Sequence, residues 1–396
     1  MRLAFRILSL SFLCLISAQV SAEVSAYGAV DSGILYSKSR VKINSVFYSG
    51  YSPRYLQEVN KRSLTELSQI VDSSIFGIKG NETISPDLSV GFQLENGFES
   101  DSGQLQDKDR LFDREASLSL ASSVGTFFAG RIAPLTAGVG SFNIFKSHAQ
   151  VFGGQYSLFD PSTDTVRRVA FDNMVGYISP TFSGLKLYAQ YSFNVNSAEA
   201  PSVRNNNRYW GMGVTYDQNN FGLTASVESY LPARREATDG DDGYIFSFGG
   251  NYDLGFAKPY VSVQLGKNLD FVGNMFKTYN DPARHDIRFT AIHLGAAVPI
   301  GAAVFKMDSF YSSSKETAGV SIVPIGSLFT SLNHEREWGI TASYEYHLSQ
   351  RTMLYGVAGY VSHSMDSKVE RRGYPYTDLS QVEKTLRAGI GLRHAF

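Results

Sequence analysis

Apolar and polar residues alternate along most of the chain, in segments of about ten residues. The segment 383–396 shows this most clearly, because one face carries Leu386, Ala388, Ile390, Leu392, His394 and Phe396, and the other carries Arg387, Gly389, Gly391, Arg393 and Ala395. Alternation with a period of two is typical of a β-strand whose faces meet different surroundings. Segments 87–98 and 184–193 repeat the pattern. The chain is therefore predicted to consist of two-faced strands.

About sixteen such strands are predicted, with turn residues between them. They lie near 23–36, 73–82, 87–99, 111–122, 125–131, 167–178, 184–195, 206–216, 221–230, 243–253, 257–267, 287–299, 302–312, 334–346, 352–363 and 384–396.

The links between these strands alternate in length. Short links fall at 81–86, 217–220, 253–256 and 347–350, and long polar links near 37–72, 100–110, 132–166, 196–205, 231–242, 268–286, 313–333 and 364–383. Transmembrane β-barrels have short turns on one side, long loops on the other and an even number of strands. A soluble β-sandwich also alternates along its strands but gives no reason for short and long links to alternate. The pattern favours a barrel.

A membrane environment would not allow the sheet of such strands to have unpaired edges. A strand in hydrocarbon cannot leave backbone groups unpaired, so the sheet must close on itself. About sixteen strands enclose an interior too wide for side chains to fill, which predicts a water channel. The predicted fold is an all-β, transmembrane antiparallel β-barrel with its apolar face outward.

The N-terminal segment has the layout of a secretory signal peptide. Arg2 and Arg6 precede an apolar run over 7–16, and Val20-Ser21-Ala22 supplies the small residues of a cleavage site. An uncleaved membrane anchor would need about 20 apolar residues. We therefore expect residues 1–22 to be removed and residues 23–396 to form the barrel, with export from the cytoplasm.

Composition narrows the possible partners and chemistry. Cys14, the only cysteine, lies in the signal segment, so the exported chain is expected to contain no thiol or disulfide. Without Arg2 and Arg6 the chain has 34 basic and 37 acidic side chains, a net charge of −3, which argues against a nucleic-acid partner.

No catalytic or cofactor motif is recognisable. The seven histidines lack the spacing of zinc ligands, and residues 239–243 (DGDDG) lack the length of an EF-hand loop. We expect no enzyme activity, no cofactor and no metal site.

Several strings carry a family resemblance. They are VSAYGAVDSGI (24–34), SIFGIKGNE (74–82), LSVGFQLENGF (88–98), LFDREASLSL (111–120), GTFFAGR (125–131), VGYISPTFSGLKLYAQYSF (175–193), YEYHLSQRTMLYGVAGYV (344–361) and GLRHAF (391–396). In this order and spacing the chain resembles the general porins of β-proteobacteria and Neisseria. The resemblance implies a sixteen-stranded outer-membrane pore for small hydrophilic solutes and ions, usually a homotrimer, surrounded by lipid and lipopolysaccharide.

The resemblance also implies a role for two parts of the chain. In these porins the third long loop folds into the channel and narrows it, which here corresponds to about 132–166. The terminal Phe396 resembles the aromatic end that the barrel-assembly machinery recognises; it would also suit a lipid-facing position at the interface.

Candidate pore residues follow from the resemblance together with strand parity, by which alternate residues of a strand face the same side. Parity places Lys79, Glu115, Arg168, Tyr27 and Asp31 on inward faces, opposite neighbours such as Phe76, Leu118 and Phe171, although Asp31 would also fit a hydrogen bond within the wall. Family members commonly have glutamine or a basic residue where Glu115 stands. The remaining constriction candidates are Arg114, Arg131, Lys146, Asp160 and Asp164.

These residues give a hypothesis for selectivity. Lys79, Arg168 and Arg131 would form a basic wall facing a mildly acidic loop, and charges at the narrowest point bias which ions enter. Arg131 and Arg114 could instead be strand-end residues, each paired with a loop carboxylate. Two alternatives stay open: a channel tuned to one class of anionic solute, and a surface adhesin that acts through its long loops.

Overall fold

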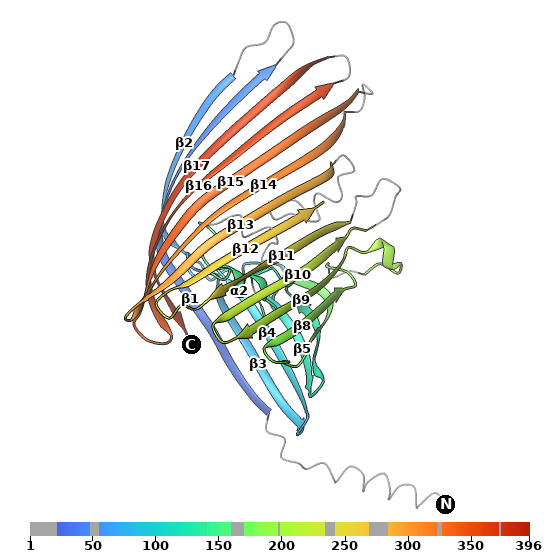
Figure 1. Cartoon of the computed structure of the whole chain (residues 1–396), viewed down its shortest axis with the longest axis vertical. Coiled ribbons are helices and arrows are strands. Elements are labelled where there is room, and N and C mark those ends of the chain that lie inside the picture. The colour runs from blue at the N-terminus through green and yellow to red at the C-terminus, as the bar shows by residue number, and fades with distance from the viewer. Residues whose placement is uncertain are drawn as a thin grey trace, which may run out of the picture.

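The computed structural model describes most of the chain (Figure 1). The described residues are 22–47, 55–138, 140–159, 170–196, 199–233, 242–268, 284–322, 327–371 and 374–396. Its strands are β1 Ala22–Phe47, β2 Tyr55–Ser68, β3 Ser74–Ser85, β4 Leu88–Phe98, β5 Glu115–Ser122, β6 Gly125–Ile132, β7 Phe171–Ile178, β8 Leu185–Ser192, β9 Arg208–Gln218, β10 Phe221–Leu231, β11 Gly243–Tyr252, β12 Lys258–Lys267, β13 Arg284–Ile300, β14 Ala303–Ile322, β15 Ser327–His347, β16 Thr352–Arg371 and β17 Tyr374–Ala395.

All these strands belong to one antiparallel sheet that closes on itself. Strands adjacent in sequence pair with each other, apart from β2 and β3, which both pair with β1. β17 returns to β1 in unbroken register from Ala29 with Ala395 to Phe47 with Thr377. The predicted barrel is confirmed, and each expected strand has a counterpart. Of the described residues, the only helical segments are the short α2 (Phe145–Ala149) and η2 (Val203–Asn205), and none is long and apolar enough to cross a membrane.

β2 is a strand that the sequence pattern did not predict. The first half of β1 pairs with β3, from Ala22 to Ala29, whereas its second half pairs with β2, from Gly33 to Ser45. β2 and β3 therefore occupy one position around the wall, one beyond the other. The barrel keeps sixteen positions although the sheet contains seventeen strands.

The barrel wall is much taller on one side than on the other (Figure 1). β5 to β8 have eight residues each, whereas β14 to β17 have 20 to 22. At about 3.3 Å per residue, β15 is about 70 Å long, more than twice the thickness of a bilayer's hydrocarbon core. Its outer part must therefore stand beyond the membrane.

This height corrects the expectation of long loops at 37–72, 313–333 and 364–383. Most of each segment continues as paired strand, and the links left between β14 and β15 and between β16 and β17 are short. Beyond the membrane both faces of a strand meet water, so apolar alternation disappears while backbone pairing continues. A prediction based on alternation ends such strands too early.

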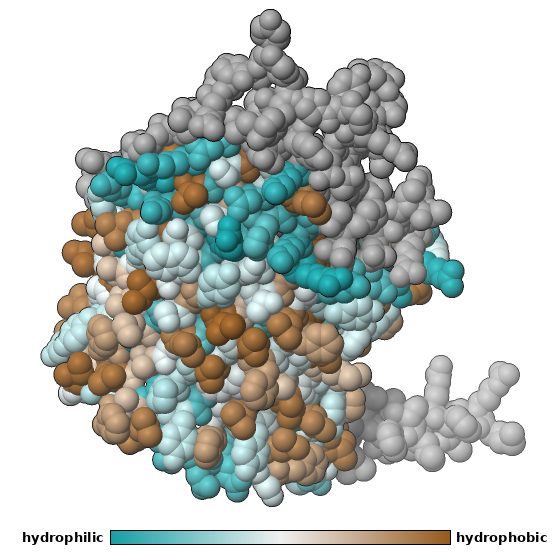
Figure 2. Space-filling view, turned by 45° about the horizontal axis from the view of Figure 1, so that its top comes forward, coloured by the Kyte–Doolittle hydropathy of each residue, from teal (hydrophilic) through white to brown (hydrophobic). Residues whose placement is uncertain are grey.

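The two faces of the wall differ as predicted. In β11, Phe246 and Phe248 are each 57% exposed, while Ile245 and Ser247 are buried. The apolar residues of β17 also point outward, Ile390 being 64% exposed. Figure 2 shows hydrophobic residues gathered over one part of the outer surface and hydrophilic residues gathered beyond them. This is the surface expected of a wall embedded in lipid.

The last residue completes the closure. The backbone N–H of Phe396 donates to the carbonyl of Gly28, and the N–H of Gly28 donates to the carbonyl of Phe396. The Phe396 ring lies where a side chain at position 28 would stand, because a Cβ on Gly28 would come within 2.6 Å of its Cζ and 2.5 Å of the Ile75 carbonyl oxygen. Gly28 therefore makes room for the terminal aromatic ring.

We expect Gly28→Ala to destabilise the barrel by about 1–3 kcal/mol, the usual cost of overpacking. The fraction of protein that migrates as a folded, heat-modifiable form in gel electrophoresis should fall. Gly356→Ala is the matched control, since its Cβ would meet only one atom, at 3.9 Å. Equal folding of the two variants would contradict this account of how Gly28 and Phe396 pack where β1 meets β17.

Candidate pore constriction

The segment between β6 and β7 enters the barrel, and we call it the third loop; its described residues are 133–138, 140–159 and 170. Its helix α2 packs against β10, β11 and β12, so this part of the loop contacts the wall opposite β3 to β5. The prediction that this segment enters the lumen agrees with its position. Two apolar clusters hold it there.

The first cluster joins the start of the loop to β7–β13. Its buried members are Ile132, Ala133, Leu135, Ala137, Phe142, Ile144, Ala170, Phe171, Met174, Val195, Tyr209, Tyr230, Ile245 and Phe289. The second cluster joins the later part of the loop to β16 and to the segment before β3. Its buried members are Ile70, Val71, Val151, Phe152, Tyr156, Phe159, Tyr355 and Val357. The loop therefore crosses the lumen, with apolar surface buried over residues 133–144 and again over residues 151–159.

Buried carboxylates of the wall fix the loop at three points. Near its start, Glu228 accepts hydrogen bonds from Thr136 (2.5 Å) and Tyr209 (2.6 Å). In the middle, Glu115 accepts from the backbone N–H of Ser141 (3.0 Å) and from its hydroxyl (2.9 Å). Hydrogen bonds to charged groups are about twice as strong as neutral ones.

The third point is Tyr156, whose hydroxyl donates to Glu345 (3.1 Å). Burial raises the pKa of Tyr156, and the nearby Glu345 raises it further, so the hydroxyl remains a donor. Arg387 on β17 donates to the carbonyl of Leu158 nearby (2.5 Å). The loop is thus held by β5, β10, β15 and β17, strands from separate parts of the chain.

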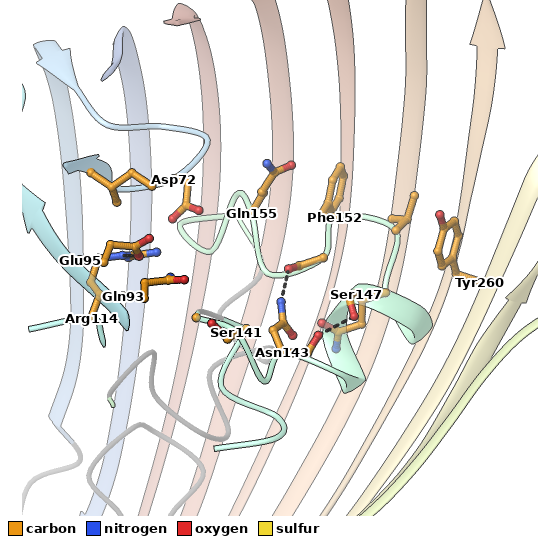
Figure 3. Close-up of a pocket in the computed structure, with 16 residues that line it drawn as sticks. Asp72, Gln93, Glu95, Arg114, Ser141, Asn143, Ser147, Phe152, Gln155 and Tyr260 are labelled. Atoms are coloured by element: carbon orange, nitrogen blue, oxygen red, sulfur yellow. Dashed lines mark hydrogen bonds and ion pairs between the residues drawn. The ribbon is translucent and has the colours of Figure 1, made fainter. Parts of the chain in front are cut away.

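A hollow of about 500 Å³ remains between the third loop and the wall of β3–β5 (Figure 3). The wall contributes Gln93, Glu95 and Arg114, and these lie across the hollow from Ser141, Asn143 and Ser147 of the loop. Asp72, Gln150, Phe152, Gln155 and Tyr260 also line it.

A second hollow of about 360 Å³ continues along the same wall. It shares Gln93 and Ser141 with the first hollow, and it is also lined by Glu23, Lys79 and Glu115. Glu23 lies at the N-terminal end of β1, where β1 pairs with β3. The two hollows together trace a path past the third loop toward the end of the barrel that carries the short turns.

Comparisons with known proteins agree with this architecture. Residues 9–366 match the family described as Gram-negative porin. The chain belongs to the Gram-negative porin family. This porin is 25% identical to an outer membrane porin protein of Bordetella pertussis, and 24% identical to outer membrane porin protein 32 of Delftia acidovorans, with 96% of both chains covered in each comparison.

Solved structures show the same fold. An anion-selective porin from Comamonas acidovorans is 19% identical, with a TM-score of 0.61 over 95% of this chain and 100% of that one. The trimer form of OmpT from Vibrio cholerae is 14% identical, with a TM-score of 0.58 over 95% and 100%. The predicted family and fold are confirmed, and the porin is an outer-membrane channel protein.

The predicted site residues that line the porin's path are Lys79, Arg114 and Glu115. Arg114 is buried and paired with Glu95 at 2.7 Å, and Glu95 also accepts a hydrogen bond from Tyr27 at 2.9 Å. The Lys79 ammonium lies over the Tyr27 ring, 5.2 Å from its centroid. These five residues lie together on the inner faces of β1, β3, β4 and the start of β5.

Arg131 and Asp31 belong to the wall rather than to the opening. Arg131 donates to the Asp172 carboxylate (2.5 Å) and to the Asp113 carbonyl (2.8 Å). It is therefore a paired strand-end residue, but its partner lies on β7 rather than in a loop. Asp31 is fully buried and accepts from the Ile70 N–H and the Tyr355 hydroxyl, each at 2.9 Å. Asp31 therefore connects β1, β16 and the segment before β3.

Lys146 does not line the path. Its side chain is 1% exposed and lies against Gly138, where a Cβ would approach its Cδ to 2.6 Å. α2 places it on the side of the loop that faces the loop's own backbone. Asp160, Asp164 and Arg168 lie outside the described residues, so their roles remain predictions.

Parity was wrong for Phe171, which was expected to face away from the lumen. Its ring is buried in the first cluster, 5.2 Å from the ring of Tyr209. Asn173 has a positive φ of 52°, and the pairing of β6 with β7 shifts between Gly130 and Ile132. Such irregularities interrupt the alternation on which parity depends.

Sequence reasoning missed several residues that line the path. Gln93 and Glu95 alternate with Phe92 and Leu94, so the same parity could have found them. Asp72 had no such signal, because it follows β2, a strand that the pattern did not predict. The expectation that the protein has no metal site remains untested. In the described part of the chain, no group of three or more His, Asp or Glu side chains could hold an ion.

The attachment of the third loop to the wall through Ser141 and Glu115, here called the clamp, can be tested by Glu115→Leu. Loss of the carboxylate leaves the donors of Ser141 without their acceptor, at a cost of about 1–3 kcal/mol. We expect larger open-channel noise and a higher mean conductance in planar bilayers, because the middle of the loop can leave the wall. Glu199→Leu, on the exposed link between β8 and β9, is the control and should leave the current trace unchanged; a quiet trace in both variants would contradict the clamp.

Proposed function

We propose that this porin is a passive channel for small hydrophilic solutes and ions that conducts along β3–β5 and weakly prefers cations. The observation that supports this path is the pair of adjoining hollows between the third loop and that wall. They are lined by four acidic side chains, Asp72, Glu95, Glu23 and Glu115, and by two basic ones, Arg114 and Lys79. An excess of one sign at a constriction favours counter-ions.

This proposal reverses the charge distribution of the sequence-based hypothesis. Arg131 is paired with Asp172, which removes it from a basic wall, and the described part of the third loop contains no Asp or Glu. The wall, not the loop, supplies the acidic groups among the described residues. A channel tuned to anionic solutes is therefore not favoured, even though one structural relative is described as anion-selective.

We further propose that the mature protein begins at Glu23 and works as a homotrimer in the lipid and lipopolysaccharide of the outer membrane. The first strand begins at Ala22, beside the expected cleavage site, and pairs there with Glu82. A trimer form is known for OmpT of Vibrio cholerae. Recognition of Phe396 by the assembly machinery is supported by its place at the closing seam.

Ion preference can be tested with Lys79→Glu. The change removes one of two basic side chains along the path and adds a carboxylate, so the reversal potential in a salt gradient should move toward the Nernst potential of the cation. Lys108→Glu is the matched control, because Lys108 is exposed on the link between β4 and β5.

An equal shift in the two variants would assign the effect to general surface charge. An unchanged reversal potential in Lys79→Glu would place the conducting path elsewhere in the barrel. Liposome swelling with small sugars, measured on the same preparations, would show passive solute flux and speak against a role restricted to adhesion.

A further inference from the structure

The lining of the first hollow is dominated by uncharged polar groups. Gln93, Asn143, Gln150 and Gln155 contribute four side-chain amides, and Ser141 and Ser147 contribute hydroxyls. Among the charged side chains of the lining, Arg114 and Glu95 form an ion pair of 2.7 Å, so their two charges largely offset each other. The narrow region is thus better suited to neutral polar solutes than to tight binding of an ion.

Gln150 is the most informative of these residues. It follows α2, its side chain is only 4% exposed, and neither its Nε2 nor its Oε1 has a hydrogen-bond partner among the described residues. Buried amides without partners are rare and destabilise the fold. The backbone holds the side chain in this position, because Val151 and Phe152 directly after it are buried in the second cluster.

The unpartnered atoms select the chemistry of a ligand. Gln150 offers both a donor and an acceptor whichever way its amide is turned, and the Oδ1 of Asn143 offers a second buried acceptor. A cation would satisfy only the acceptors and an anion only the donor. A hydroxyl group both donates and accepts, so adjacent hydroxyls on one molecule match this set.

Aromatic side chains complete the site. Phe152 and Tyr260 line the same hollow, and Figure 3 shows them beyond Asn143 and Ser147, across from the wall that carries Gln93. Small-molecule sites combine apolar and aromatic surface with a few placed polar groups, in volumes of about 300–1,000 Å³. The hollow of about 500 Å³ falls in this range.

We propose that the first hollow is a transient binding site for neutral polyhydroxylated solutes of mono- to disaccharide size. The amides of Gln150 and Asn143 hydrogen-bond to the hydroxyls, and Phe152 packs against the C–H face of the ring. This inference rests on the conducting path proposed above. Binding is weak, because a channel site that held its solute tightly would block flux.

The test is a titration of glucose and maltose on the folded trimer in planar bilayers. We expect concentration-dependent interruptions of the ion current, with half-maximal effect in the millimolar range. Polyethylene glycol of matched hydrodynamic size, which has hydroxyls only at its ends, should lower the current only as it lowers the conductivity of the solution. Sugars that act no differently from this polymer would overturn the proposal.

Variants locate the site. Gln150→Leu, which keeps the size of the side chain, should raise the half-blocking concentration about five- to tenfold through loss of its hydrogen bonds to the solute. Phe152→Leu, which keeps an apolar residue in the second cluster, should also raise the half-blocking concentration. It tests the site if Gln150→Leu fails to fold. Gln104→Leu, on the exposed link between β4 and β5, is the control. Wild-type values in both site variants would refute the assignment.

A measurement without current separates this proposal from the conducting path. Saturation-transfer NMR on the detergent-folded trimer detects glucose bound to the protein whether or not ions pass. Binding that Gln150→Leu abolishes supports the site even if the reversal-potential test moves the ion path elsewhere. Full conductance with no glucose signal would overturn the site and leave the channel assignment intact.

Discussion

Closure of the backbone hydrogen-bonding ladder between β1 and β17 is the constraint on which the rest of the structure depends. In hydrocarbon an unpaired strand edge costs several kcal/mol for each unsatisfied group, so an open sheet would not remain in the membrane. The seam runs in register from Ala29 with Ala395 to Phe47 with Thr377, and Phe396 adds two bonds to Gly28 at its end. Closure fixes the circumference, and the circumference leaves an interior that one loop can occupy.

The interior is filled unevenly because the third loop is bound to the wall rather than suspended in the lumen. One apolar cluster anchors its first part and another anchors residues 151–159, and Glu228, Glu115 and Glu345 fix it at separate points. Carboxylates suit this task, since they accept hydrogen bonds from backbone, hydroxyl and phenol donors alike. Among the described residues, two adjoining hollows lie between the loop and the wall of β3–β5, beside the contact of Ser141 with Glu115.

The composition of that opening connects structure to transport. Of the charged side chains that line it, Arg114 is paired with Glu95, and in the nearby wall Arg131 is paired with Asp172. These pairs order the wall, while amides and hydroxyls supply other contacts in the first hollow. The proposed diffusion channel would combine selection by size and weak hydrogen bonding with its weak preference for cations.

The sequence by itself determined the barrel, and only the tertiary structure decided what the inward residues do. Each membrane-spanning strand needs one face for lipid and one for water, and this requirement appears locally as alternation, so the strands, the short turns and the outward position of Ile390 could be predicted. The rule failed beyond the membrane, as in β2, and at irregular backbone, as before Phe171. Parity assigns a face but not a partner, and partners such as Asp172 for Arg131 come from segments distant in sequence. The path of the third loop, and with it the burial of Lys146, is set by clusters and carboxylates on many strands, because no local pattern encodes it.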